Sequence, residues 1–106
     1  MSDFANPFCG MSPDRKLTPR ELSRAIRMAM AAELEAIHMY EALADATEDP
    51  LAAKVFQDVA NEEREHVGEF GKLLELMLDD ENVKLQHGAK EVLEMRDELR
   101  QAGLVK

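Results

Sequence analysis

The fold is decided by residues 18–50, TPRELSRAIRMAMAAELEAIHMYEALADATEDP. The stretch opens with a capping box, because Thr18 is a good N-cap, Pro19 suits the first helical position and Glu21 reaches back to the start. No Gly or Pro follows until the last residue of the stretch, and apolar residues recur at spacings of three or four. We therefore predict a helix over residues 18–46.

A second helix is expected directly after the first. Asp49 is a suitable N-cap and Pro50 suits the first helical position. The residues that then form an apolar face are Phe56, Val59, Ala60, Val67, Phe70, Leu74 and Met77. These features predict a helix over residues 50–78, and the polar residues 79–82 indicate where it ends. A shorter third helix is predicted over residues 89–101.

The expected architecture is all-α. It has an irregular N-terminal arm over residues 1–17, an antiparallel two-helix hairpin over 18–78, and a linker with a short C-terminal helix over 79–106. A helix of about 29 residues is about 43 Å long, and a lone hairpin of that length cannot cover its own apolar faces. We expect a second copy to complete a four-helix bundle by dimerisation.

Composition narrows the range of partners. The 106 residues include 22 Asp and Glu against 13 Lys and Arg, so the formal net charge is −9. This balance argues against nucleic acid and anionic membranes as partners, and it favours cations, metal ions included. The single Cys9 cannot form an internal disulfide, a four-cysteine zinc site or a rubredoxin-type iron centre. With no signal peptide or membrane span visible, we expect a cytoplasmic protein.

Two carboxylates interrupt the apolar faces of the predicted helices. Glu33 lies four residues before Ile37 on the first face, and Glu63 lies four residues before Val67 on the second. A lone carboxylate in a buried face would cost several kcal/mol or be forced to protonate. We therefore expect a cation to neutralise them, and no Lys or Arg shares either face at that level.

The spacing of these residues predicts one metal site. The connection between the helices centres on residue 48, so Glu33 lies 15 residues before it and Glu63 lies 15 residues after it. His66 follows Glu63 by three positions and can reach the same ion. Di-iron carboxylate bundles use a Glu from each of two helices and a Glu-x-x-His from each of the other two. One hairpin supplies half of this set for Fe(II) or Mn(II), and a two-fold dimer would supply the rest.

Three further side chains have open assignments. Glu35 and His38 form a second Glu-x-x-His, which we expect to point away from Glu33 because two residues correspond to about 200° around a helix. The pair is either solvent-facing or an outer metal site. Tyr40, two turns from Glu33, is either a packed aromatic or a hydrogen-bond partner of a ligand.

Residues 32–40 (AELEAIHMY) and 61–66 (NEEREH) resemble the encapsulated ferritins, which are half-ferritins related to ferritin and rubrerythrin. The similarity covers about residues 18–78. It implies two-helix subunits that pair into a ferroxidase dimer, dimers that assemble into an annular decamer, and packaging with an encapsulin shell protein inside a nanocompartment that stores the oxidised iron.

The resemblance also implies roles for individual residues. The di-iron ligands would be Glu33, Glu63 and His66 from each of two chains, with Tyr40 close by, and Glu35 would match one carboxylate of a site through which iron enters. Ala32 and Met39 depart from the family pattern, since a second carboxylate and, in some members, a Trp stand there.

Three functions follow from these observations. The first is a ferroxidase with a shared di-iron centre that feeds iron storage. The second is a rubrerythrin-like di-iron peroxidase served by a separate electron donor. The third is a non-enzymatic, acidic helical dimerisation scaffold.

Overall fold

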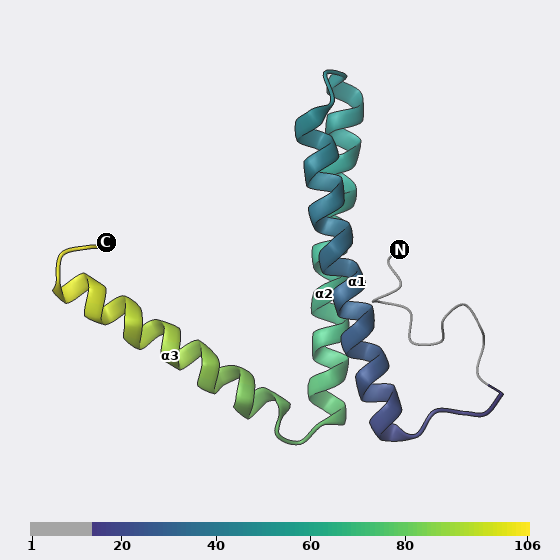
Figure 1. Cartoon of the computed structure of the whole chain (residues 1–106), viewed down its shortest axis with the longest axis vertical. Coiled ribbons are helices and arrows are strands. Elements are labelled where there is room, and N and C mark those ends of the chain that lie inside the picture. The colour runs from purple at the N-terminus through teal and green to yellow at the C-terminus, as the bar shows by residue number, and fades with distance from the viewer. Residues whose placement is uncertain (1–13) are drawn as a thin grey trace.

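A computed structural model describes residues 14–106 of the chain. The described part contains three α-helices: α1 (Pro19–Ala46), α2 (Pro50–Met77) and α3 (Glu81–Gln101). Helices α1 and α2 run antiparallel and side by side, whereas α3 leads away from them (Figure 1). The predicted all-α hairpin is confirmed, and its two helices begin and end within one residue of the predicted bounds. The predicted arm falls largely on residues 1–13, outside the described part.

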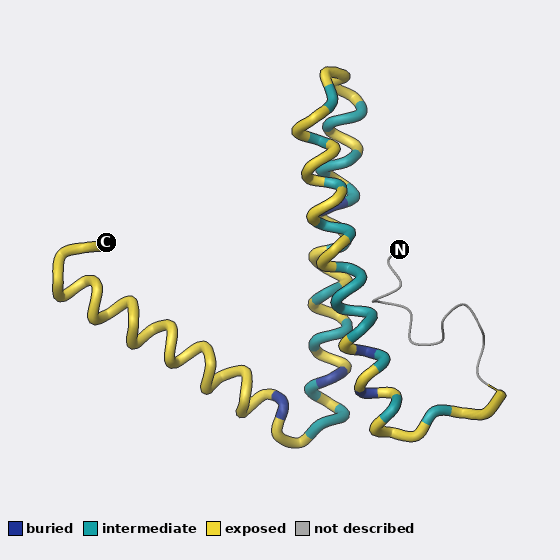
Figure 2. Tube along the Cα trace, in the orientation of Figure 1, coloured by how far each residue is buried: buried dark blue, intermediate teal, exposed yellow. Residues whose placement is uncertain are grey.

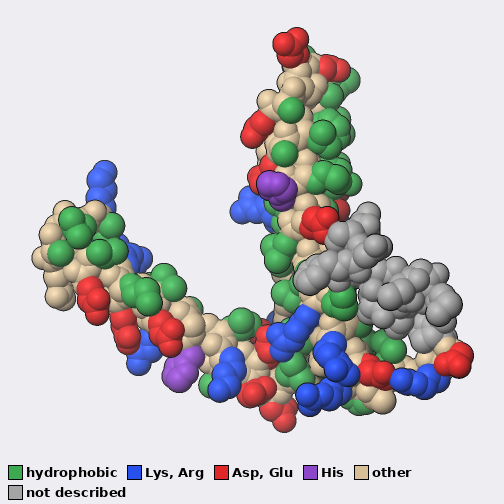
Figure 3. All heavy atoms as spheres, viewed as in Figure 1, with side chains coloured by type: hydrophobic (Ala, Val, Ile, Leu, Met, Phe, Trp, Pro, Cys, Tyr) green, Lys and Arg blue, Asp and Glu red, His purple; other side chains and the backbone are tan. Residues whose placement is uncertain are grey.

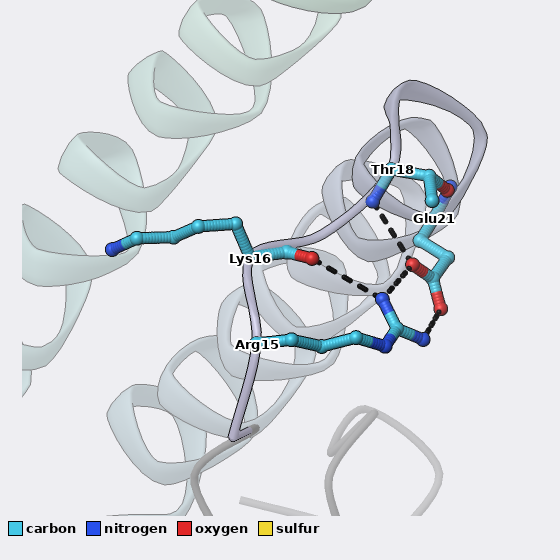
Figure 4. Close-up of polar contacts among 4 residues, drawn as sticks. All are labelled: Arg15, Lys16, Thr18 and Glu21. Carbon is cyan, nitrogen blue, oxygen red and sulfur yellow. Dashed lines mark hydrogen bonds and ion pairs between the residues drawn. The ribbon is translucent and has the colours of Figure 1, made fainter.

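The start of α1 is stabilised by side chains that bind backbone groups. The Oγ1 atom of Thr18 accepts a hydrogen bond from the Glu21 N–H at 3.1 Å, and Glu21 Oε1 accepts one from the Thr18 N–H at 2.9 Å. This is the capping box that the sequence predicts. Arg15 adds a bidentate ion pair, with 2.7 and 2.8 Å between its guanidinium nitrogens and the Glu21 carboxylate oxygens (Figure 4). Three residues, Arg15, Thr18 and Glu21, thus define where α1 begins.

Hydrogen bonds also define where α1 ends and where α2 begins. Thr47 ends α1, with its N–H bonded to the Leu43 carbonyl oxygen. Two residues later the Asp49 side chain accepts a hydrogen bond from the Leu51 N–H at 3.1 Å, and Pro50 is the first residue of α2. With both helix ends determined locally, the depth of each residue along the hairpin is determined as well.

The hairpin buries little of its apolar surface. Ile26, Ala60 and Leu74 are the buried apolar residues of the described part, and most of the remaining inner face is half-buried (Figure 2). Figure 3 shows apolar side chains exposed along one edge of the hairpin and over α3. The Cα radius of gyration is 18.2 Å, against about 13 Å for a compact domain of this length. The expectation that one hairpin leaves its apolar faces uncovered is confirmed.

The predicted start of the third helix is wrong, because α3 begins at Glu81 rather than at residue 89. Residues 81–87 carry a weak apolar pattern but are mostly good helix formers. The buried Glu81 carboxylate also receives two hydrogen bonds from Arg27 of α1, at 2.8 and 3.3 Å. Gly88 is tolerated within the exposed helix at a cost of about 1 kcal/mol. Among residues 14–106 no helix is both long and apolar enough to cross a membrane.

The Glu21 carboxylate at the start of α1 makes the stability of the hairpin depend on pH. Arg15, followed by the Thr18 N–H, holds the pKa of Glu21 at about 2, below its ordinary value of 4.5. A carboxylate with a depressed folded-state pKa contributes stability above its unfolded pKa and loses it as the pH falls through the folded pKa. We expect Glu21→Gln to lower the melting temperature above about pH 4.5, and this difference from the wild type to vanish as the pH falls to about 2.

Thermal unfolding followed by circular dichroism, at a series of pH values, measures this difference. Arg15→Gln is the matched control, because it leaves the carboxylate in place and removes the largest cause of its low pKa. It should reduce the same pH-dependent difference. A Glu21→Gln effect of equal size at pH 2 and at neutral pH contradicts the assignment.

Candidate metal centre

The hairpin brings together Glu33 from α1 with Glu63 and His66 from α2. The Nδ1 atom of His66 lies 3.4 Å from Oε2 of Glu63 and 3.6 Å from Oε2 of Glu33. One ligand atom from each of the three side chains lies within 4.8 Å of the other two. Among residues 14–106 this is the only group of three or more His, Cys, Asp and Glu side chains arranged in this way.

The local geometry of each helix explains this arrangement. Glu63 and His66 are three residues apart on α2, so both side chains project from the same side of the helix. The equal distances from the connection then place Glu33 opposite them across the groove between α1 and α2. No residue between these positions disturbs either helix, since both run unbroken from cap to cap.

The charges of this group are not balanced within the chain. The Glu33 and Glu63 side chains are 22% and 18% exposed, and His66 is 46% exposed. Among the described residues no Lys or Arg pairs with either carboxylate, and the distances to the His66 ring are long for hydrogen bonds. Two half-buried carboxylates therefore share one imidazole, which leaves most of their acceptor capacity unused.

This donor set fits a divalent metal ion. Carboxylate oxygens and an imidazole nitrogen suit Fe(II) and Mn(II), which also favour more than the three protein ligands gathered here. Glu33, Glu63 and His66 would hold the ion, and its remaining positions would be open to water, to a substrate or to ligands from another chain. The arrangement is therefore half of a symmetric site or an open single-metal site.

A hollow lies beside the ligands, lined by Ala32, Glu33, Glu35, Ala36, Met39, Tyr40 and Glu63. Tyr40 lines it and stacks on Phe56 of α2, with 6.3 Å between the ring centroids and 18° between the ring planes. Among residues 14–106 its hydroxyl makes no hydrogen bond to the three ligands. The small side chains of Ala32 and Ala36, one turn apart, leave space at this position, and the apolar pattern alone does not indicate a hollow.

The two residues of the second Glu-x-x-His motif, Glu35 and His38, have different surroundings in the structure. Glu35 is exposed and lines the same hollow as Glu33, and the expectation that it points away from Glu33 stays a prediction. Two residues correspond to about 200° around α1, but the hollow reaches both glutamates, and the flanking Ala32 and Ala36 that also line it are small. His38 is exposed and does not line the hollow. Within the described residues, neither belongs to a group of three potential ligands.

Comparison with known proteins identifies relatives of this chain. The family model described as Rubrerythrin matches residues 11–102. The ferritin-like–encapsulin shell fusion protein of Pyrococcus furiosus is 47% identical over 83 residues, which are 77% of this chain and 24% of that protein. The encapsulin nanocompartment cargo protein EncC of Myxococcus xanthus is 46% identical over 69 residues, 65% of this chain and 52% of that protein. The chain thus spans a quarter to a half of the length of these two relatives.

The fold has a close counterpart among solved structures. The crystal structure of the encapsulated ferritin domain from Pyrococcus furiosus superposes with a TM-score of 0.77 at 40% sequence identity, covering 84% of this chain and 90% of that one. The chain therefore belongs to the rubrerythrin family of ferritin-like proteins, and within it to the encapsulated ferritins.

Proposed function

We propose that this protein is a ferroxidase, which oxidises Fe(II) to Fe(III) at a di-iron centre shared between two copies of the chain. The observation that carries the proposal is the meeting of Glu33, Glu63 and His66 within 4.8 Å on a half-buried face. Membership of a ferritin-like family whose members typically bind iron supports the choice of metal.

The incomplete ligand set supports a shared centre. One chain offers three ligand atoms, and exposed apolar side chains continue the same side of the hairpin: Met39 and Leu43 on α1, and Val55 on α2. A second hairpin packed against this side would cover them and bring a second Glu33, Glu63 and His66. The sum is then the four carboxylates and two imidazoles of a di-iron carboxylate bundle. In this arrangement Glu33 and His66 of each chain would hold one ion, and the two Glu63 carboxylates would be shared between the ions.

The proposed reaction has iron as its substrate. Two Fe(II) ions give up two electrons, and with two protons these reduce O₂ to H₂O₂, or H₂O₂ to two water molecules. A site that holds both ions delivers the electrons as a pair and releases no one-electron product. The protein side chains bind and orient the two ions and compensate their increased charge with carboxylates, and Tyr40 borders the space beside them.

The oxidised iron must then be stored outside this chain, because a two-helix hairpin has no interior in which a mineral could grow. Two relatives are named as an encapsulin shell fusion and an encapsulin cargo protein. We extend this association to the present chain, as a cargo that works inside an encapsulin nanocompartment of the cytoplasm and supplies Fe(III) to its store.

The ligand assignment predicts the effect of three substitutions. Glu33→Ala, Glu63→Ala and His66→Ala each remove one protein ligand, and we expect each to lower the initial rate of Fe(II) oxidation by at least about tenfold, since even the outer partners of metal ligands typically contribute that much. The formation of Fe(III) followed by absorbance gives the rate, and circular dichroism confirms unchanged helix content.

Glu62→Ala is the matched control on α2, since Glu62 is an exposed neighbour of Glu63 outside the ligand group. It should oxidise iron at nearly the wild-type rate. Full activity in the Glu33→Ala and Glu63→Ala variants would falsify the site. Consumption of H₂O₂ with an added reductant, and no oxidation of Fe(II) by O₂, would indicate a peroxidase instead.

The shared centre predicts a stoichiometry and a change of mass. Without a cation, the carboxylates of two facing hairpins repel one another, so anaerobic Fe(II) should promote association along the site-bearing face. We expect about one iron bound per chain, together with an increase in mass measured by light scattering.

The double variant Glu33→Leu, Glu63→Leu is the control for this measurement. Leucines remove the repulsion and keep the apolar face, so it should associate without iron and bind none. Iron-independent mass in the wild type, with no stoichiometric binding, would instead indicate a helical scaffold.

A further inference from the structure

The hollow beside the three ligands is lined by a residue whose chemistry the proposed function does not use. Met39 lines this hollow together with Glu33 and Glu63. The thioether sulfur of methionine is soft and polarisable, and oxidants convert it to a sulfoxide. An oxidisable side chain therefore borders the same space as two of the proposed ligands of a redox metal.

The other residues that line the hollow offer an oxidant less than Met39 does. Ala32 and Ala36 end at a methyl group, and the glutamates end at carboxylates that are already oxidised. The ring of Tyr40 stacks on Phe56, with 6.3 Å between the ring centroids. Methionine is unbranched and has three rotatable bonds, and Met39 is 47% exposed. Its sulfur is therefore the most adaptable reactive atom of the hollow.

Two other described methionines separate the effect of the hollow from simpler effects. Met95 on α3 is 58% exposed, more than Met39, and does not line the hollow. Met30 is one turn before Glu33 on α1, but it is half-buried, its terminal methyl group lies beside Gly71 of α2, and it does not line the hollow either. Exposure alone would favour oxidation of Met95, and closeness to a ligand along the helix would favour Met30.

The proposed reaction supplies an oxidant at this place. When two Fe(II) ions give two electrons to O₂, with two protons, the product is H₂O₂. This peroxide forms between the ligands, and the hollow that Glu33 and Glu63 line is a path by which it leaves them. A second hairpin packed over this side would hold the peroxide in the hollow and would shield Met39 from oxidants in the solvent.

We propose that Met39 is a site of self-modification, where H₂O₂ formed by iron oxidation converts the thioether to a sulfoxide before the peroxide leaves the hollow. The inference rests on the proposed ferroxidase function, and it assigns a fate to part of the product of that function. It concerns a residue that binds neither iron ion and that is not required for iron oxidation.

The step is balanced without a further reactant. The Met39 sulfur gives a lone pair to one oxygen of H₂O₂, so that an S–O bond forms and the O–O bond breaks. The other oxygen leaves with its own hydrogen and takes up the hydrogen of the first oxygen, which makes water. Sulfur loses two electrons and the peroxide gains them.

The modification changes the chain in a lasting but limited way. Each chain contains one Met39, so it consumes one peroxide molecule by this step until the sulfoxide is reduced again. The sulfoxide is polar, whereas the thioether is an apolar part of the wall. Met39 sulfoxide therefore marks a chain that has oxidised iron, and it does not clear peroxide continuously.

Peptide mass spectrometry of the full chain tests the proposal. Fe(II) is added in air together with catalase, which destroys peroxide that has reached the solvent, and the gain of one oxygen atom is measured at each methionine. Met39 should be modified more than Met95 and more than Met30. Treatment with H₂O₂ in the absence of iron should reverse the order of Met39 and Met95, because Met95 is the more exposed of the two.

Glu63→Ala is the matched control for the source of the oxidant. It removes a proposed ligand and leaves Met39 in place, so the excess of modification at Met39 over Met95 should disappear. An equal excess in this variant overturns the proposal, because the oxidant then comes from elsewhere. The absorbance of Fe(III) in the same samples separates the two levels of inference. Normal iron oxidation without an excess at Met39 overturns the self-modification alone, and the absence of iron oxidation overturns both.

Met39→Leu provides an independent measurement. Leucine has a similar volume and no sulfur, so the rate of Fe(II) oxidation should stay near that of the wild type. In the first turnovers without catalase, this variant should release more H₂O₂ per Fe(II) oxidised than the wild type, and the difference should vanish once Met39 of the wild type has been converted. Met95→Leu is the matched control and should release as much as the wild type. Equal release from Met39→Leu and the wild type in the first turnovers overturns the proposal.

Discussion

The register of the antiparallel hairpin is the constraint on which the rest of this protein depends. Thr18 and Asp49 cap the two long helices, and the connection between them leaves no freedom to shift one helix along the other. Glu33 and Glu63 therefore meet at the same depth. A shift of one residue in either helix would turn its carboxylate by about 100° and move it by about 1.5 Å, which would remove it from the group.

The small core of the hairpin has consequences for its chemistry. Three apolar residues are buried among those described, so the hairpin has no closed interior. The Glu33 and Glu63 carboxylates therefore lie in a groove where they are only partly exposed to solvent. There they are desolvated enough to attract a cation and open enough to exchange one. The same lack of cover leaves apolar side chains exposed beside the ligands, so metal binding and pairing of hairpins are favoured by the same surface.

Helix α3 also has apolar side chains that nothing in the chain covers. A single ion pair, Arg27 with Glu81, joins the start of α3 to α1, and the rest of the helix extends into solvent. The ion pair sets the direction in which α3 leaves the hairpin.

The sequence by itself determined the features that depend on neighbours in the chain. Capping residues predicted the starts of α1 and α2 to within one residue, and the spacing of Glu33, Glu63 and His66 predicted the group that the hairpin assembles. These predictions succeeded because they use distances of three or four residues and the symmetry of one connection. The tertiary structure alone decided the start of α3, which depends on a contact between residues 54 positions apart. It also decided that Glu35 lines one hollow with Glu63 of α2, because that depends on how the second helix packs beside the small side chains of Ala32 and Ala36. Helical periodicity describes one helix at a time, and neither feature belongs to a single helix.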